Sequence, residues 1–262
     1  MLEGRKAALL EAVVAEHIRT AEPVGSKLLA GKYGLSVSSA TVRNALAALE
    51  EEGYLTHPHT SAGRVPTIKG YRYYVTHCLA EKPLAKKERE TIEERCIKSF
   101  ENKRLRVKEL ARVVAEVAHE AILVGFTSDD VYYTGLSYLL AQPEFSDHDL
   151  ALTMSHVFDR LDETMAEFAT SVHDDFAVAI GDENPFGNDT SVVVVRYGKD
   201  EDQLFGILGP TRMDYAANIA LAKYPKRKMI EKIFERRTLQ FQENKLEERW
   251  VFKIQKVGYD IL

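Results

Sequence analysis

The chain has 262 residues, of which 45% are hydrophobic and 29% are charged, and its formal net charge at pH 7 is −5. This composition excludes a disordered chain and predicts a folded, soluble protein of about two domains. No stretch approaches the ~18 consecutive apolar residues of a membrane span, and the two cysteines are too few for a disulfide framework. We therefore expect a cytoplasmic protein with no membrane partner.

Three helices are predicted in the N-terminal part. Residues 5–20 carry apolar side chains at the three- and four-residue spacing that buries one helix face. A short apolar helix over residues 26–32, a turn and a third helix from Ser39 follow. Ser38 suits the N-cap of the third helix, because its hydroxyl can accept a hydrogen bond from an N–H of the first turn. The buried stripe expected in the third helix consists of Val42, Ala45, Leu46 and Leu49.

The outward face of the third helix carries polar side chains near its start. Ser39, Thr41, Arg43 and Asn44 lie away from the apolar stripe. Helix-turn-helix proteins enter the DNA major groove with this arrangement: a short helix, a turn, and a second helix that carries such side chains in its first turns. The alternative is a small three-helix packing unit in which Arg43 is only solvated.

Residues 55–66 predict two short strands around a glycine-containing loop, as in the wing of a winged helix-turn-helix. From Gly53 to Ala80 the sequence contains no Asp or Glu. The absence of carboxylates removes repulsion from phosphates, so this stretch is expected to contact double-stranded DNA. The alternative is an ordinary solvated loop. The predicted DNA contacts in this stretch are His59, Thr60, Ser61, Arg64, Lys69 and Arg72.

Four segments are expected: a DNA-binding domain over residues 1–80, a linker over 81–118, a second domain over 119–224 and a tail over 225–262. In the linker, apolar residues punctuate a charged sequence, which predicts one long or broken helix. Its irregular heptad spacing leaves pairing in a coiled coil open. The tail is predicted to continue a helix to about Leu239 and then to form a strand or docking segment around residues 250–257.

The second domain is predicted to be α+β. Runs of β-branched and aromatic residues alternate with an amphipathic stretch over residues 145–171, which favours a small antiparallel sheet with helices on one face. Thr211 is expected to cap the helix that follows it, and a ligand site at that helix start is the alternative. Strands are predicted over residues 121–126, 131–134, 176–180, 191–197 and 204–208.

The charge is distributed unevenly along the chain. Residues 1–112 contain 20 Lys and Arg against 14 Asp and Glu, whereas residues 113–225 contain 5 against 20, and the remaining residues contain 10 against 6. A basic N-terminal half attracts phosphates and an acidic second half is repelled by them. We expect docking on DNA through the N-terminal half, although acidic surfaces also simply favour solubility.

Several runs resemble the family of heat-inducible transcription repressors called HrcA. The longest are HTSAGRVPT at residues 59–67 and KGYRYYV at residues 69–75, and SATVRN at residues 39–44 fits the recognition helix of the same family. Shorter matches follow in the family's order. They are residues 135–137 with 142–145, residues 180–181 with 183–185, and GPTRMDY at residues 209–215.

The resemblance implies a repressor of heat-shock (chaperonin) operons with a GAF-like second domain. It implies that a homodimer binds an inverted-repeat operator of the CIRCE type, and that the GroEL chaperonin is a partner. The chain departs from the family in one place. Only ten residues separate Val124 from Gly135, where the family carries an inserted segment linked to dimerisation. Dimer contacts are therefore expected in the second domain, the linker helix or the tail.

No enzyme, cofactor or metal site is predicted. The sequence lacks a Gly-x-Ser-x-Gly motif, a phosphate loop, a dinucleotide fingerprint and paired Cys/His spacing. We expect the second domain to serve conformation and assembly rather than to sense a small molecule. Three alternatives stay open: a metabolite-responsive winged-helix repressor of the GntR kind, a winged-helix protein with a catalytic second domain of the biotin ligase–repressor type, and a purely structural interaction module.

Overall fold

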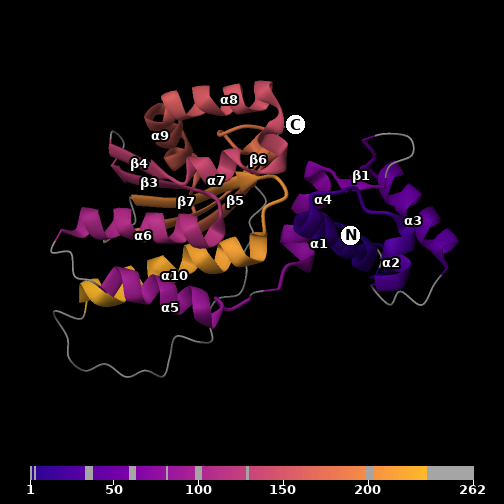
Figure 1. Cartoon of the computed structure of the whole chain (residues 1–262), viewed down its shortest axis with the longest axis horizontal. Coiled ribbons are helices and arrows are strands. Elements are labelled where there is room, and N and C mark those ends of the chain that lie inside the picture. The colour runs from indigo at the N-terminus through magenta and orange to yellow at the C-terminus, as the bar shows by residue number, and fades with distance from the viewer. Residues whose placement is uncertain are drawn as a thin grey trace.

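A computed structural model of the chain describes residues 2, 4–32, 38–58, 63–80, 82–97, 102–127, 130–198 and 203–234, with side chains as far as residue 224. Its N-terminal part lies to one side of a larger part built around a five-stranded sheet (Figure 1). Among the described residues, no helix is long and apolar enough to cross a membrane.

Helices and one small sheet make up the N-terminal part. Most of the apolar stripe predicted in the first helix is buried, as are Val42, Leu46 and Leu49 in the third, whereas Ile18 and Ala45 are half-buried. The predicted cap is also confirmed, because Ser38 Oγ accepts a hydrogen bond from the Thr41 N–H at 3.2 Å. The elements are α1 (Gly4–Thr20), α2 (Ser26–Lys32), α3 (Ser39–Glu51), β1 (Leu55–Thr56), β2 (Val65–Pro66), α4 (Ile68–Tyr73) and the π-helical turn η1 (Tyr74–Cys78).

The larger part contains an antiparallel sheet with the strand order β4-β3-β7-β6-β5. All five strands coincide with predicted ones to within two residues at either end. The run Val192–Val195 is buried throughout, so both faces of β6 need cover. The strands are β3 (Ala121–Thr127), β4 (Asp130–Thr134), β5 (Phe176–Ile180), β6 (Thr190–Tyr197) and β7 (Gln203–Pro210).

Helices cover both faces of this sheet, which corrects the expectation of helices on one face (Figure 1). On one face Val193 and Val195 of β6 pack with α6 and α10, and on the other Val192 and Val194 pack with α8 and α9. The predicted linker is a broken helix whose second half belongs to the first of these layers. The helices are α5 (Lys86–Ile97), α6 (Lys103–Ala118), α7 (Leu136–Leu140), η2 (Pro143–Ser146), α8 (His148–Asp159), α9 (Leu161–Ser171), η3 (Gly181–Glu183) and α10 (Tyr215–Phe234).

Two predicted helix boundaries are wrong. The helix expected over residues 145–171 is interrupted at Arg160, whose φ of −119° and ψ of 30° are not helical. The helix after residue 211 is capped by Asp214 rather than Thr211, because Asp214 Oδ1 accepts the Ala217 N–H at 3.1 Å. The N–H of Thr211 instead donates to the carbonyl oxygen of Asp189 at 3.0 Å.

The end of the chain is described only in part. Helix α10 runs to Phe234, so the predicted boundary after residue 224 falls inside a helix. The predicted continuation of a helix is confirmed as far as Phe234, and its expected end near Leu239 lies outside the described residues. The strand or docking segment expected at residues 250–257 lies outside the described residues.

Candidate nucleic-acid interface

The outer face of α3 presents three of the predicted DNA contacts to solvent. Thr41, Arg43 and Asn44 are exposed, and Arg43 has no ion-pair partner among the described residues. Ser39 is half-buried, and its hydroxyl lies 3.1 Å from that of Ser26. Ser39 therefore joins the first turns of α2 and α3, while the other three side chains point outward from a capped helix start.

The two strands β1 and β2 form an antiparallel pair, and β1 packs against α3. His59, Thr60 and Ser61, which lie between the strands, are outside the described residues. Arg64 lies directly before β2, and its backbone exchanges two hydrogen bonds with Val24, at 2.8 and 2.9 Å. The base of the predicted wing is thus tied to the segment that leads into α2.

The guanidinium of Arg64 forms an ion pair with a carboxylate of α3. Arg64 Nη2 lies 2.7 Å from Glu50 Oε2, and His57 Nδ1 hydrogen-bonds the other oxygen, Oε1. Burial acts to raise the pKa of Glu50, but the hydrogen bond with His57 and the charge of Arg64 outweigh it, so the pKa is lowered. Glu50 is therefore ionised at neutral pH and neutralises part of the positive charge of the predicted wing.

Lys69 and Arg72 also have partners within the molecule. Lys69 Nζ donates to the carbonyl oxygen of Glu52 at 2.7 Å and lies 4.4 Å from the centre of the Tyr54 ring. A cation in this place complements the negative end of the α3 dipole. Arg72 pairs with Asp182 at 2.7 Å and with Glu183 at 3.0 Å. Arg72 therefore lies between the two parts of the protein rather than on an open face.

Arg72 belongs to a junction where the N-terminal part meets the sheet. His17 Nδ1 lies 2.6 Å from the hydroxyl of Tyr71, whose ring centre is 6.1 Å from that of Tyr215. Burial lowers the pKa of His17 and raises that of Tyr71. Ile68 packs directly against Gly181, where an added Cβ would lie 2.4 Å from Ile68 Cδ1.

The second half of the junction is built around Arg212. Its guanidinium donates to Gln142 Oε1 at 2.8 Å, pairs with the Glu144 carboxylate and reaches the carbonyl oxygen of Ile18 at 3.4 Å. Nearby Glu120 is 5% exposed, and one of its oxygens has no hydrogen-bond partner among the described residues. Burial raises the pKa of this carboxyl well above its usual range, which favours the neutral form.

The junction brings together sequence runs that are far apart in the chain. The runs at residues 69–75, 142–145, 180–185 and 209–215 each contribute a side chain or a glycine to it. Sequence reasoning singled out these runs but not their convergence. It also missed Glu50 and His57, because no periodic pattern relates the end of a helix to the base of the hairpin that follows.

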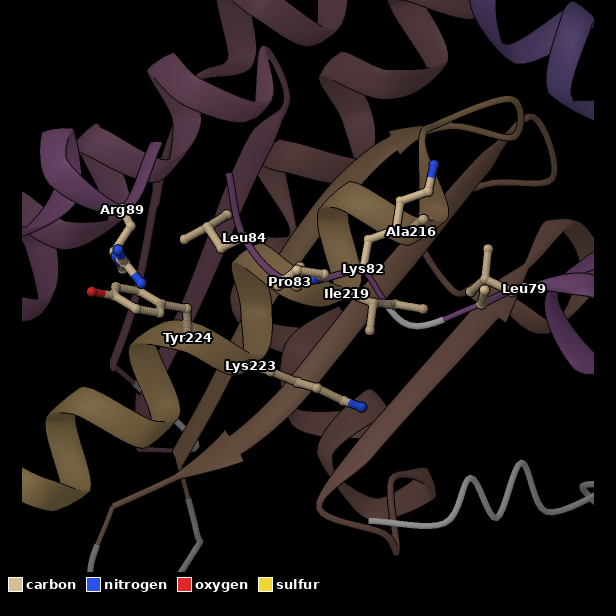
Figure 2. Close-up of a pocket in the computed structure, with 11 residues that line it drawn as sticks. Leu79, Lys82, Pro83, Leu84, Arg89, Ala216, Ile219, Lys223 and Tyr224 are labelled. Atoms are coloured by element: carbon tan, nitrogen blue, oxygen red, sulfur yellow. The ribbon is translucent and has the colours of Figure 1, made fainter. Parts of the chain in front are cut away.

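A cavity of about 240 Å³ lies between the segment 79–84 and one face of α10 (Figure 2). On the α10 side it is lined by Ala216, Ile219, Ala220, Lys223 and Tyr224. Figure 2 shows Lys82 and Lys223 pointing in different directions and Arg89 beside Tyr224 at the other end. The cavity thus lacks the converging polar groups that orient a small ligand. Within the described ranges, no group of three or more His, Cys, Asp or Glu residues could hold a metal ion.

Curated relatives match parts of the chain. The heat-inducible transcription repressor HrcA of Cutibacterium acnes is 44% identical over 126 residues, which are 48% of this chain and 37% of that protein. The repressor of the same name from Nocardioides sp. is 55% identical over 92 residues, or 35% of this chain and 27% of that protein. The chain therefore spans about a third of the length of these relatives.

A longer alignment and a solved structure extend the comparison. The HrcA repressor of Halalkalibacterium halodurans is 26% identical over 328 positions, covering 86% of this chain and 95% of that protein. Because 328 positions exceed the 262 residues of the chain, that relative contains segments absent here. The crystal structure of a hypothetical protein shares the fold, with a TM-score of 0.71 at 18% identity over 90% of this chain and 99% of that one.

A family model settles the assignment. Residues 67–219, more than half of the chain, match the model described as the HrcA protein C-terminal domain. The matched segment begins at the cap of α4 and ends within α10, so it contains the whole five-stranded sheet. The chain belongs to the HrcA family.

Proposed function

We propose that this protein is a DNA-binding transcriptional repressor of heat-shock (chaperonin) operons, with a winged helix-turn-helix over residues 1–80. The observation that carries the proposal is the open outer face of α3, where Thr41, Arg43 and Asn44 are exposed on a capped helix. Such a helix fits the major groove, where arginine and asparagine can pair with base edges. The names of the matched relatives, heat-inducible transcription repressors, support the same role.

The predicted contacts divide by role in this proposal. Arg43 and Asn44 read bases, and Ser39 and Thr41 adjoin the backbone at the start of α3. Arg64 and Lys69 position the phosphate backbone from the wing side, together with His59, Thr60 and Ser61. Arg72 serves the junction instead, because its guanidinium is held by two carboxylates of the second part.

The operator is proposed to be an inverted repeat of the CIRCE type, read by a homodimer. Each recognition helix must meet its own half-site, so a two-fold assembly is required. Dimer contacts are assigned to the GAF-like domain over residues 119–224, to the linker over 81–118 or to the tail over 225–262. Sedimentation of the full chain and of a chain lacking residues 226–262 tests this. A full chain that stays monomeric with and without operator DNA contradicts the proposal.

The second domain is proposed to act in conformation and assembly, with the GroEL chaperonin as a partner in the cytoplasm, and without enzyme activity or cofactor. The divergent side chains around the cavity of Figure 2 support this over ligand sensing. A thermal-shift screen of metabolites decides between this role and the alternative, a metabolite-responsive repressor. A metabolite that raises the unfolding temperature and also changes operator affinity would overturn the assembly role.

The central experiment is a DNA-binding titration by fluorescence anisotropy. The inverted repeat from the organism's own chaperonin promoter is compared with a scrambled duplex of equal length and composition, at several salt concentrations. We expect tighter binding to the inverted repeat, and affinity on both duplexes that falls as salt rises. Equal affinity for the two duplexes at every salt concentration would refute specific repression, and no binding to either would refute the DNA-binding role.

A further inference from the structure

The predicted wing is too short to hold its own position. Within the described residues, strands β1 and β2 contain two residues each and form two residue pairs, Leu55 with Pro66 and Thr56 with Val65. A two-stranded hairpin of this size is at best marginally stable in water. Contacts outside the hairpin must therefore fix its direction relative to α3.

One carboxylate makes such a contact with both sides of the hairpin. His57 directly follows β1 and Arg64 directly precedes β2, and the two oxygens of Glu50 accept one hydrogen bond from each of these side chains. Glu50 lies in the last turn of α3. Its side chain thus connects the end of the helix to the base of the wing on both strands, and it is 23% exposed, so water screens the contact only in part.

The backbone adds a second tie at the same place. Arg64 exchanges two hydrogen bonds with Val24, and an added Cβ at Gly63 would lie 2.6 Å from the carbonyl carbon and oxygen of Val24. This tie holds the main chain of Arg64, and the Glu50 carboxylate holds the same residue through its guanidinium, so the loss of either contact should loosen this end of the hairpin. The side chains of the next two acids, Glu51 at the end of α3 and Glu52 directly after it, do neither. Glu52 pairs with Lys6, and Glu51 is exposed without a partner among the described residues.

A carboxylate here opposes DNA binding by its charge alone. Phosphates repel it, and it neutralises part of the positive charge on Arg64. We propose that Glu50 is a positioning residue for operator binding, which holds the wing and Arg64 in a fixed place relative to α3. This inference rests on the proposed DNA-binding function. It gives an acidic side chain a supporting role in DNA binding, although its charge alone would weaken that binding.

The test compares Glu50→Gln with Glu51→Gln, because each removes one negative charge from the same helix end. Repulsion alone predicts that both variants bind DNA more tightly than the wild type. A positioning role predicts opposite signs: Glu51→Gln binds the inverted repeat slightly more tightly, and Glu50→Gln binds it about tenfold more weakly. Equal tightening by both variants would overturn the inference, provided that the wild type binds.

A double-mutant cycle shows whether Glu50 acts through Arg64. In an Arg64→Ala background, the loss caused by Glu50→Gln should shrink to less than about twofold, because the group that it positions is gone. The full tenfold loss in that background would contradict a role of Glu50 through Arg64 and leave only its contact with His57. The loss of affinity in Arg64→Ala alone also measures how much the Arg64 side chain contributes to DNA binding.

Hydrogen exchange separates this inference from the proposed function, because it needs no DNA. The Arg64 amide, which donates to Val24, should exchange about tenfold faster in free Glu50→Gln than in free Glu51→Gln, while buried amides of β6 stay unchanged. If neither variant alters exchange at the wing, the positioning role fails even when the wild type binds its operator. If exchange changes and no chain binds DNA, the proposed function fails instead.

Discussion

The outer face of α3 and the stretch that follows it, from Gly53 to Ala80, differ in how their cationic side chains are paired. Arg43 has no charged partner within the described part of the chain, whereas Arg64 pairs with Glu50 and Arg72 with Asp182 and Glu183. Both regions lie in the basic half of the sequence, and the second contains no acidic residue of its own. A stretch without carboxylates can therefore still be neutralised by carboxylates that fold onto it from elsewhere.

The largest expected effect tests whether the junction around Arg72 is packed in solution. Gly181 has a φ of +61°, and an added Cβ would meet Ile68. Gly181→Val should lower the free energy of unfolding by about 3 kcal/mol, through backbone strain and displacement of Ile68. Urea denaturation measures this. Gly31→Ala in α2 is the control, since nothing lies within 4 Å of its added Cβ. A wild-type midpoint for Gly181→Val would mean that the two parts do not meet there.

The sequence predicts best what depends on neighbouring residues. The stripe and cap of α3 and the five strands follow from spacing and local chemistry, and the structure agrees with them. The break at Arg160 leaves the apolar spacing of residues 154, 158, 161, 165 and 168 almost intact, so periodicity cannot reveal it. The two-sided cover of the sheet was readable from the unbroken run Val192–Val195, because a strand with one wet face alternates.

In the candidate site, too, the features that depend on neighbouring residues can be predicted, and the long-range pairings cannot. The exposure of Arg43 depends only on its place relative to the buried stripe of its own helix, so the sequence sufficed to predict it. The partners of Arg72 are 110 and 111 residues away along the chain, at a turn that only the folded sheet brings near. No local pattern can show such a pairing. The sequence therefore identifies the cations of the predicted surface, but only the folded structure shows which of them are paired with carboxylates.

Arg43→Ala should give the largest effect on DNA binding. Arginine pairs with guanine edges through two hydrogen bonds, so its loss should cost about 1–3 kcal/mol on the inverted repeat and relax specificity at one position. Anisotropy titrations on operator and scrambled duplexes measure the difference. Arg160→Ala, which removes an exposed arginine from the second part, should leave both affinities unchanged. An equal loss on the two duplexes for Arg43→Ala would remove it from the base-reading set.

Arg72→Ala should change stability and leave DNA binding as it is. Its ion pairs are partly exposed, with 39% of the Arg72 side chain and 69% of the Asp182 side chain accessible, so the loss is expected to be at most about 1 kcal/mol. The charge swap Arg72→Asp with Asp182→Arg should recover part of that loss in urea denaturation. Weaker binding to both duplexes with unchanged stability would return Arg72 to the DNA-contacting surface.

The smallest expected effect concerns Lys69, whose pairing is intermediate between that of Arg43, which has no charged partner in the described part of the chain, and that of Arg72, which is paired with carboxylates. Its ammonium is exposed, and its partners are the Glu52 carbonyl and the Tyr54 ring rather than a carboxylate, so its full charge remains available to a phosphate. Lys69→Ala should weaken operator and scrambled DNA alike and lower the slope of log affinity against log salt by about 1. Lys69→Arg keeps the charge and should preserve that slope. A loss confined to the operator would show that Lys69 reads sequence, and an unchanged slope would show that it does not contact phosphate.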